Sequence, residues 1–333
     1  MELLRREDSA IYRLSDVDIR MLRVFMAIVE SQGLTNAQAI LNIGQPTISN
    51  HLANLEGRLG IKLCYRGRGG FRLTSKGEQV YEEAVRLLKV MERFENVTME
   101  LKGSLRGYLN VAVIDSAITD TKNPVISALE TFNSRSHEVT VRLEVMTPFE
   151  LGRAVLDLDV DVAVGTFDHH IAGLEYRPIY VESNELYCGR KHPLYRARGR
   201  SQIRKLVREA KKVTRTYLEG RDLYPLGHDD GIANAQVRYL EAAAILILAG
   251  GHVGFLPKHY AQFWVHKDEM RCILPEEYKY RSQFYIVTRK SPRKSVILDT
   301  FLRDLNDVVA GHLATATSEE MDLPELAVAN TSD

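Results

Sequence analysis

The hydrophobic positions near the start of the chain follow a helical period in three successive segments. In residues 18–31 apolar side chains recur every three or four positions, and Gly33 stands where a C-cap glycine belongs. Residues 35–41 form a shorter second pattern. A third begins at Pro46, whose missing N–H costs nothing in a first helical turn, and ends at Gly60. The apolar positions of the first and third segments are Ile19, Leu22, Phe25, Ile28, Val29, Ile48, Leu52, Leu55 and Leu59.

Two short helices joined by a turn at residues 42–44 are typical of a helix-turn-helix. The polar side of the third helix carries amides, hydroxyls and a guanidinium, which are the groups that recognise base edges in a major groove. Any exposed helix face is polar, so the prediction depends on the neighbouring features as well. The candidate DNA-binding residues of this region are Thr35, Gln45, Pro46, Thr47, Ser49, Asn50, Asn54 and Arg58.

Residues 61–73 alternate weakly and contain three glycines between Tyr65 and Phe71. This pattern predicts a hairpin with a glycine-rich tip, which after a helix-turn-helix is a wing. Six basic residues and no acidic one occur between positions 58 and 76. A solvated run of charge is the alternative, but on a wing these arginines favour contact with phosphates or a minor groove. The candidate wing residues are Arg66, Arg68 and Arg72.

A long amphipathic helix follows, with Thr74 as its expected cap and residues 75–103 as its extent. Its seam residues are spaced alternately by four and three, which is the heptad period of a coiled coil. We therefore expect a homodimer that places two recognition helices on two half-sites of double-stranded DNA. The seam positions are Val80, Ala84, Leu87, Met91, Phe94, Thr98 and Leu101.

Beyond Gly103 the pattern changes to alternating strands and helices. Strands are expected at residues 108–114, 139–145 and 160–165, with helices from Pro124, capped by Asn123, and from Pro148, which is the order of a parallel sheet with helical crossovers. A similar order follows as a strand at 213–217, a helix at about 234–248, a strand at 253–256 and a helix from Pro257. Two α/β lobes with a cleft between them are therefore expected. Residues 1–14 are expected to form an extension, and residues 316–333 a flexible tail.

Composition narrows the classes of protein. The chain has 333 residues, zero formal net charge, 45% hydrophobic and 26% charged residues, which fits a soluble protein of two or three domains. Its three cysteines lack the spacing of a zinc site. We find no apolar run long enough to span a bilayer and no signal peptide, so we expect a cytoplasmic location with no membrane partner. No cofactor and no metal site are expected.

Residues 18–80 closely resemble the N-terminal domain of LysR-type transcriptional regulators, and landmarks of that family's effector domain recur later. The matching residues are Gln45-Pro46, Ile48-Ser49, Leu52, Leu55-Glu56, Leu59-Gly60, Leu63, Arg66, Leu73-Thr74, Gly77, the stretch DLDVDVAVG at 157–165, His192-Pro193-Leu194 and AGGHVGFLP at 249–257. The sequence departs from the family at Gly44, Asn50 and Cys64, so the operator sequence cannot be transferred.

The resemblance implies a multidomain α+β and α/β fold. A winged helix-turn-helix at 15–74 and the linker helix would precede an effector domain at 104–315 like a periplasmic binding protein. Its first lobe would comprise about 106–180 and 286–315, its second about 181–285, and two crossing strands would join them. The resemblance also implies homotetramers, promoter DNA and a small-molecule effector as partners, with RNA polymerase as a further partner to consider.

Effectors of α/β domains bind at the carboxyl ends of parallel strands, near helix N-termini. Hydroxyls with free backbone N–H groups at these places suit a carboxylate, and aromatic side chains could flank a ring. The same hydroxyls could simply cap helices, and the aromatics could belong to the core. The candidate effector-binding residues are Ser116, Thr147, Phe149, Thr166, Phe167, Thr216 and Tyr217.

The sequence leaves three other functions to weigh. An enzyme is disfavoured, because the glycines at 250, 251 and 254 follow a helix and no nucleophile elbow or Walker loop occurs. A ligand-independent architectural DNA-binding protein would not need two lobes of some 200 residues. A redox-responsive regulator acting through Cys188 and Cys272 is the third, although buried structural thiols are commoner. The acid and histidines at 168–170 fit a solvated loop better than a metal site.

Overall fold

The chain forms two compact units, residues 1–94 and 95–333, in a computed structural model that describes residues 14–66, 70–100, 105–167, 169–227, 233–291 and 294–316. The predicted extension before Leu14, the wing residue Arg68 and the predicted tail after residue 316 lie outside the described residues.

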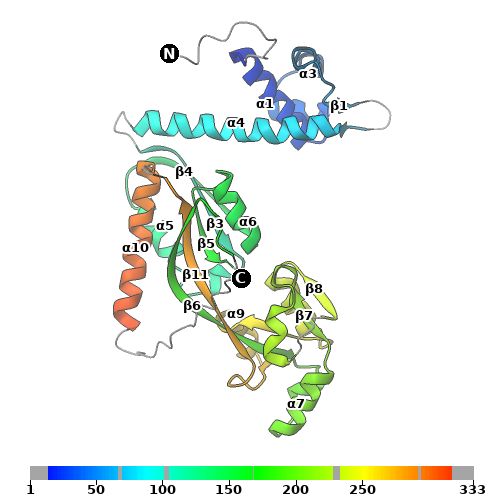
Figure 1. The fold of residues 1–333 in the computed structure, drawn as a ribbon, viewed down its shortest axis with the longest axis vertical. Coiled ribbons are helices and arrows are strands. Elements are labelled where there is room, and N and C mark those ends of the chain that lie inside the picture. Colours follow the sequence, from blue (N-terminus) through cyan, green and yellow to red (C-terminus); the bar gives the residue numbers. More distant parts are fainter. Residues whose placement is uncertain are drawn as a thin grey trace, which may run out of the picture. The chain divides into compact units, whose positions relative to one another are not determined.

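The first unit is three helices, a short hairpin and most of a long helix (Figure 1). Its first three helices begin and end within two residues of the predicted positions. Asn42 and Gly60 close α2 and α3 in left-handed backbone conformations, at φ of 51° and 67°. Phe25, Ile28 and Ile48 are fully buried where the three helices meet. The elements are α1 (Asp16–Glu30), α2 (Leu34–Leu41), α3 (Gln45–Leu59), β1 (Cys64–Tyr65), β2 (Arg72–Leu73) and α4 (Ser75–Glu100).

The long helix α4 starts as the sequence predicts, because the Thr74 hydroxyl accepts a hydrogen bond from the Gly77 N–H at 2.9 Å. A Cβ on Gly77 would lie 1.9 Å from the carbonyl oxygen of Leu63, so this close approach requires glycine. The first half of the predicted heptad seam has a role within the chain: Ala84 is buried and Leu87 packs partly against the core of the first unit. Further along the seam, Phe94 is 71% exposed.

The second unit contains one nine-stranded sheet, in which β10 pairs with β6 beside the path β4-β3-β5-β11-β6-β9-β7-β8. The strands at each end of the sheet pair in parallel. In the middle, the long strands β6 and β11 pair antiparallel and run through both lobes (Figure 1). The strands are β3 (Arg106–Ile114), β4 (Glu138–Met146), β5 (Val162–Thr166), β6 (Leu174–Gly189), β7 (Lys212–Arg215), β8 (Ala235–Val237), β9 (Val253–Pro257), β10 (Met270–Cys272) and β11 (Lys279–Arg289).

Helices cover each half of this sheet. In the first lobe α10 packs on α5, where the rings of Phe132 and Phe301 meet edge to face with centroids 5.8 Å apart and Arg135 pairs with the buried Asp304 at 2.5 Å. The helices are α5 (Val125–Asn133), α6 (Pro148–Leu156), α7 (Arg200–Glu209), α8 (Leu240–Leu248), α9 (Lys258–Val265) and α10 (Val296–Ala316), with short 3₁₀ turns η2 (Ala117–Thr119), η3 (Pro193–Tyr195), η4 (Thr216–Leu218) and η5 (Arg221–Leu226).

Two predictions for the second lobe were wrong in detail. The helix expected from residue 234 begins at Leu240, because residues 235–237 pair with β7 as the edge strand β8. The strand expected at 213–217 ends at Arg215, after which the chain turns into η4. Pairing partners distant in sequence decide both boundaries, and no local periodicity reveals them.

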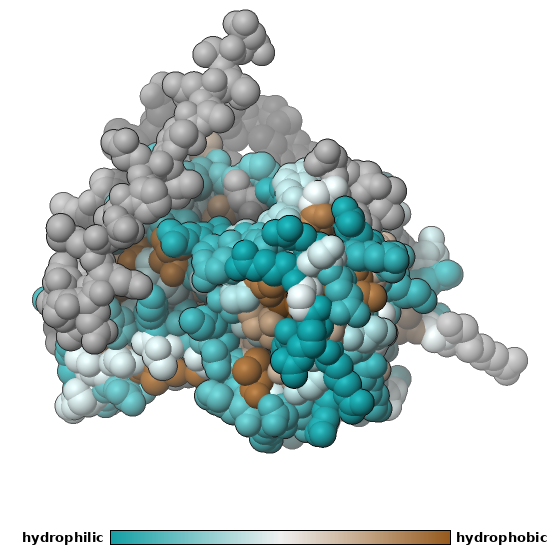
Figure 2. All heavy atoms as spheres, turned by 90° about the horizontal axis from the view of Figure 1, so that it is seen from below, coloured by the Kyte–Doolittle hydropathy of each residue, from teal (hydrophilic) through white to brown (hydrophobic). Residues whose placement is uncertain are grey.

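The face of the protein seen in Figure 2 is mostly hydrophilic, with hydrophobic side chains in small, separate patches. Among the described helices, none combines the length and the apolar character needed to cross a membrane.

Candidate functional site

The predicted recognition helix α3 has one buried and one exposed face. Ile48, Leu52 and Leu55 are fully buried. The predicted polar residues Gln45, Pro46, Thr47, Asn50 and Asn54 are exposed, and Ser49 is half-buried. The helix begins from an extended Gly44 with Pro46 in its first turn, so the polar face starts at the helix N-terminus, as base recognition in a helix-turn-helix requires.

A groove of about 550 Å³ brings together predicted residues from three elements of the first unit. Thr35 from α2, Gln45 and Ser49 from α3, and Arg66 from the wing line it. The Arg66 guanidinium donates a hydrogen bond to the Ser49 hydroxyl at 2.9 Å, which ties the base of the wing to the recognition helix. Arg72, the other described wing arginine, is exposed on β2 with its guanidinium 5.9 Å from the Tyr65 ring centroid.

Arg58, which is predicted to contact DNA, also pairs within the first unit. Its guanidinium donates to both carboxylate oxygens of Asp18, with Nε to Oδ1 at 2.5 Å and the second bond at 2.7 Å. Asp18 is fully buried on α1, and its Oδ2 also accepts bonds from the N–H and hydroxyl of Ser15 at 2.8 and 2.6 Å. A buried carboxylate needs such partners, so Arg58 stabilises the fold by joining α3 to α1.

In the second unit a cavity of about 250 Å³ lies between the two lobes. The carboxyl ends of β3 and β5 form one wall, β6 and β11 form the floor, and residues after β7 form the other wall. Four of the predicted effector-binding residues line it: Ser116, Thr166, Phe167 and Tyr217. The further lining residues are Ile114, Asp115, Glu182, Arg215, Leu218, Arg221, Asp222, Leu240, Tyr280, Arg281, Ser282, Gln283, Phe284 and Tyr285.

The other three predicted effector-binding residues are not among those lining this cavity. The Thr147 hydroxyl is a helix cap: it donates to Glu150 Oε2 at 2.7 Å, and the same oxygen accepts the Thr147 N–H at 2.9 Å. Phe149 is 64% exposed beside Arg153. Thr216 is exposed in η4, where the chain has already left the strand. The assignment of these three residues to effector binding stays a prediction, which the lining of this cavity does not support.

Arg215 is the cavity residue that sequence reasoning missed. It is 5% exposed at the end of β7, and its guanidinium donates to the Tyr280 hydroxyl and, at 3.5 Å, to Asn184 Oδ1. Its Nε and the Tyr217 hydroxyl have no hydrogen-bond partner among the described residues, although both are buried. The sequence KVTR gives no signal for this, because a basic residue at a strand end is usually exposed.

Two carboxylates, the half-buried Asp115 and the buried Asp222, also face the cavity. Asp115 Oδ2 accepts the backbone N–H of Leu240 at 2.6 Å, at the N-terminus of α8, and burial raises the pKa of Asp115. The Asp222 carboxylate accepts a bond from the Thr214 hydroxyl, and burial raises its pKa as well. The cavity therefore places a guanidinium among acidic groups in a poorly solvated space.

The surroundings of the two cysteines considered for redox sensing disfavour the thiolate form. Burial raises the pKa of Cys188 and of Cys272 to about 12. Cys272 also donates to Glu185 Oε2 at 3.2 Å, and the negative carboxylate further disfavours a thiolate. Since the thiolate is the reactive form, the structure gives no support to the redox alternative.

Comparison with known proteins identifies this arrangement. The family model "Bacterial regulatory helix-turn-helix protein, lysR family" matches residues 19–78, and "LysR substrate binding domain" matches residues 102–310. The chain belongs to the LysR family of transcription regulators. This LysR-type regulator is 35% identical over 301 residues to the HTH-type transcriptional activator BauR of Pseudomonas aeruginosa, covering 90% of the chain and 98% of that protein.

Two further similarities agree with this assignment. BenM of Acinetobacter baylyi, an HTH-type transcriptional regulator, is 36% identical over 85 residues, or 26% of this chain and 28% of BenM. The crystal structure of full-length CbnR with its target DNA has the same fold, with a TM-score of 0.63, 22% identity and coverage of 87% of this chain and 99% of CbnR. The predicted family and fold class are confirmed.

As a LysR-type protein, the chain is a transcription regulator with a DNA-binding domain and an effector-binding domain. Proteins of this family are generally not enzymes. The match over the two-lobed domain favours an effector-responsive regulator over the architectural DNA-binding protein that the sequence left open.

Proposed function

We propose that α3 reads base edges of promoter DNA through Gln45, Thr47 and Asn50, and that the wing arginines bind the backbone. Their exposure at the N-terminal end of α3 supports this assignment. Asn50→Ala is expected to weaken binding to the operator by about 1–3 kcal/mol and to leave binding to random duplex nearly unchanged. Fluorescence anisotropy on both duplexes tests it, and equal losses on the two would remove Asn50 from base recognition.

We propose that two chains associate through the later part of the α4 seam, giving a homodimer and, as the family resemblance implies, a homotetramer. The heptad spacing and the 71% exposure of Phe94 support this. Phe94→Lys is expected to shift sedimentation toward the monomer, whereas Glu95→Lys, an exposed neighbour off the seam, should not. We also propose a cytoplasmic location, because promoter DNA would be the binding partner, and RNA polymerase as a further partner.

We propose that the effector is a small carboxylate bound in the interlobe cavity. The observation that carries this is the pair of unpartnered buried groups, Arg215 Nε and the Tyr217 hydroxyl, at the cavity wall. Leaving buried donors without partners costs free energy, and a carboxylate oxygen is the acceptor that a guanidinium binds best. Phe167 and Tyr285 supply apolar contact on the opposite side.

The test is selective thermal stabilisation of the full chain by a panel of carboxylic acids and their amides. Tyr217→Phe keeps the ring and removes only the hydroxyl. It should therefore weaken binding of the selected acid by about 1 kcal/mol, which is roughly fivefold in Kd. Tyr224→Phe, on an exposed tyrosine of η5, is the matched control. Equal stabilisation by acid and amide would contradict a carboxylate-binding role for Arg215.

A further inference from the structure

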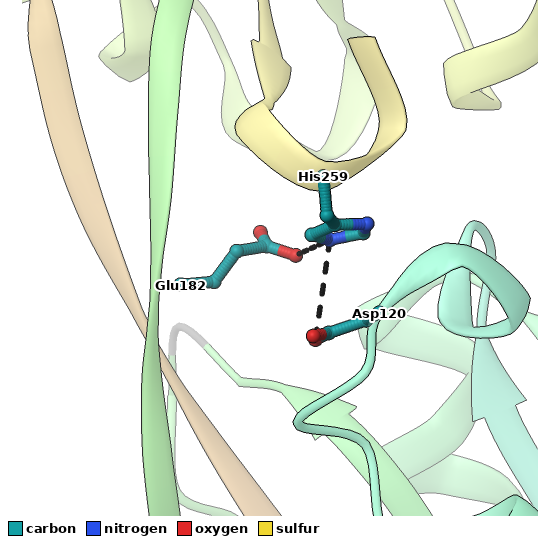
Figure 3. A group of neighbouring side chains, drawn as sticks. All are labelled: Asp120, Glu182 and His259. Carbon is teal, nitrogen blue, oxygen red and sulfur yellow. Dashed lines mark hydrogen bonds and ion pairs between the residues drawn. The ribbon is translucent and has the colours of Figure 1, made fainter. Parts of the chain in front are cut away.

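Three side chains from different parts of the second unit converge beside the interlobe cavity (Figure 3). Asp120 follows η2 in the first lobe, Glu182 lies in the middle of β6, and His259 is the second residue of α9 in the second lobe. His259 Nε2 lies 2.9 Å from Glu182 Oε1 and 3.9 Å from Asp120 Oδ2. The two carboxylates are 6% and 8% exposed, so the cluster is buried on its acidic side.

A hydrogen bond at Nδ1, on the side of the ring away from the carboxylates, fixes the orientation of the His259 imidazole. The Thr119 hydroxyl donates to the Ser116 carbonyl oxygen at 3.0 Å and lies within hydrogen-bond distance of His259 Nδ1, at 2.8 Å. These contacts orient the imidazole with Nε2 directed at the two carboxylates. In the tautomer that carries its proton on Nδ1, the Nε2 lone pair would face carboxylate oxygens, and a cation between them would relieve this repulsion.

The carboxylates are held in the same way. Asp120 Oδ2 accepts the Tyr180 hydroxyl at 2.5 Å, and Oδ1 accepts the backbone N–H of Lys122 at 3.0 Å. Glu182 Oε2 accepts the side-chain amide of Asn184 at 3.1 Å, which leaves Oε1 directed at His259. Hydrogen-bond partners outside the ligands, which fix the imidazole tautomer and the carboxylate orientation, are typical of metal sites in proteins.

We propose that Asp120, Glu182 and His259 bind a divalent first-row transition-metal ion of the Zn²⁺ type. With metal–ligand bonds of about 2.1 Å, tetrahedral ligand atoms lie about 3.4 Å apart. The two Nε2–oxygen distances bracket that value, and all three ligand atoms lie within 4.8 Å of one another, so small side-chain movements complete the site. Two carboxylates neutralise a divalent charge, and the imidazole selects against Mg²⁺ and Ca²⁺.

Such an ion would join the two lobes, because its ligands come from both lobes and from a strand that crosses between them. Glu182 also lines the proposed effector cavity, so the ion would fix one of the cavity's acidic groups. The proposal goes beyond the carboxylate effector and does not depend on it, since metal binding is measurable without effector or DNA.

The experiment is competition of tag-free, chelator-treated full-length protein with a chromogenic indicator for Zn²⁺. Wild type is expected to bind one Zn²⁺ per chain with Mg²⁺ in excess. His259→Ala should weaken this binding at least about tenfold, and Thr119→Val, which keeps all three ligands but loses the bond to Nδ1, by about 10–100-fold. His266→Ala removes an exposed histidine at the end of the same helix and is the control that should not change binding.

Thermal denaturation of each variant without metal shows which of them is folded. If His259→Ala is not folded, Thr119→Val still tests the proposal. Absence of stoichiometric Zn²⁺ binding to folded wild type, or binding that His259→Ala and Thr119→Val leave unchanged, would overturn the proposal. The cluster would then be a set of polar contacts of His259 with Glu182 and Asp120 between the lobes, without an ion.

Discussion

The pairing of Arg58 with Asp18 predicts that Arg58 stabilises the first unit, whereas the sequence alone suggests that it contacts DNA. Removing Arg58 takes both guanidinium hydrogen bonds away from the buried Asp18 carboxylate, which still accepts the N–H and the hydroxyl of Ser15. Breaking a fully buried ion pair costs about 3–5 kcal/mol. Because the Arg58 side chain is 45% exposed and water can replace part of its contribution, we expect Arg58→Ala to lower the free energy of unfolding of the first unit by about 2 kcal/mol.

The assay follows urea unfolding of the full chain with two probes. The single tryptophan, Trp264, lies on α9 in the second unit, so its fluorescence reports only that unit. Far-UV circular dichroism reports the helices of both units. Arg58→Ala should therefore shift one component of the dichroism transition to lower urea and leave the Trp264 transition in place.

A double-mutant cycle separates the ion pair from other effects of the substitution. Asp18→Asn removes the buried charge, so it should cost at least about 1 kcal/mol less in the Arg58→Ala background than in wild type. If Arg58→Ala leaves the unfolding midpoint unchanged but reduces the salt slope of DNA binding by about one unit, the guanidinium binds phosphate instead and the structural role is refuted.

Three further perturbations test other parts of the structure. Arg66→Ala should weaken binding to all duplexes and flatten the salt slope by about one unit, measured by anisotropy at several salt concentrations. Gly77→Ala should destabilise the first unit by about 1–3 kcal/mol in urea unfolding, since its Cβ would meet the Leu63 carbonyl. Burial, and next His252, lowers the pKa of His192, whose Nδ1 accepts the Leu194 N–H. The unfolded state therefore binds a proton more readily, and the stability that His192 contributes above the unfolded-state pKa of about 6.5 should be lost as the pH falls below that value. His192→Asn should reduce this pH-dependent loss of stability in thermal denaturation.

The elements that the sequence predicted well are those whose boundaries are local. Each of the first three helices has an apolar period of its own and a glycine or proline at its ends, and these features act within a few residues. The Thr74 cap and the Thr147 capping box are also encoded within three residues of the helix start. Thr147 shows the ambiguity of such signals, because a hydroxyl that begins a helix is as suitable for capping as for binding an effector.

The features that the sequence did not predict depend on partners far along the chain. Asp18 and Arg58 are 40 residues apart, and Arg215 meets Tyr280 across 65. No periodicity indicates that a charged side chain will be buried, because burial is decided by which segments pack around it. The crossing strand β11 follows the same rule, because it pairs with β5 and β6, which lie far earlier in the chain.

The position of the cavity gives the two-lobed domain a physical means of sensing a ligand. Its walls come from both lobes, with Ser116 and Thr166 on one side and Arg215 and Tyr217 on the other. A ligand that contacts both walls binds more strongly when the lobes are closed, and it can shift the lobe equilibrium only by that difference in affinity. Because Glu182 lines the cavity and also contacts His259, we expect an ion bound by the cluster and a ligand bound in the cavity to change each other's affinity.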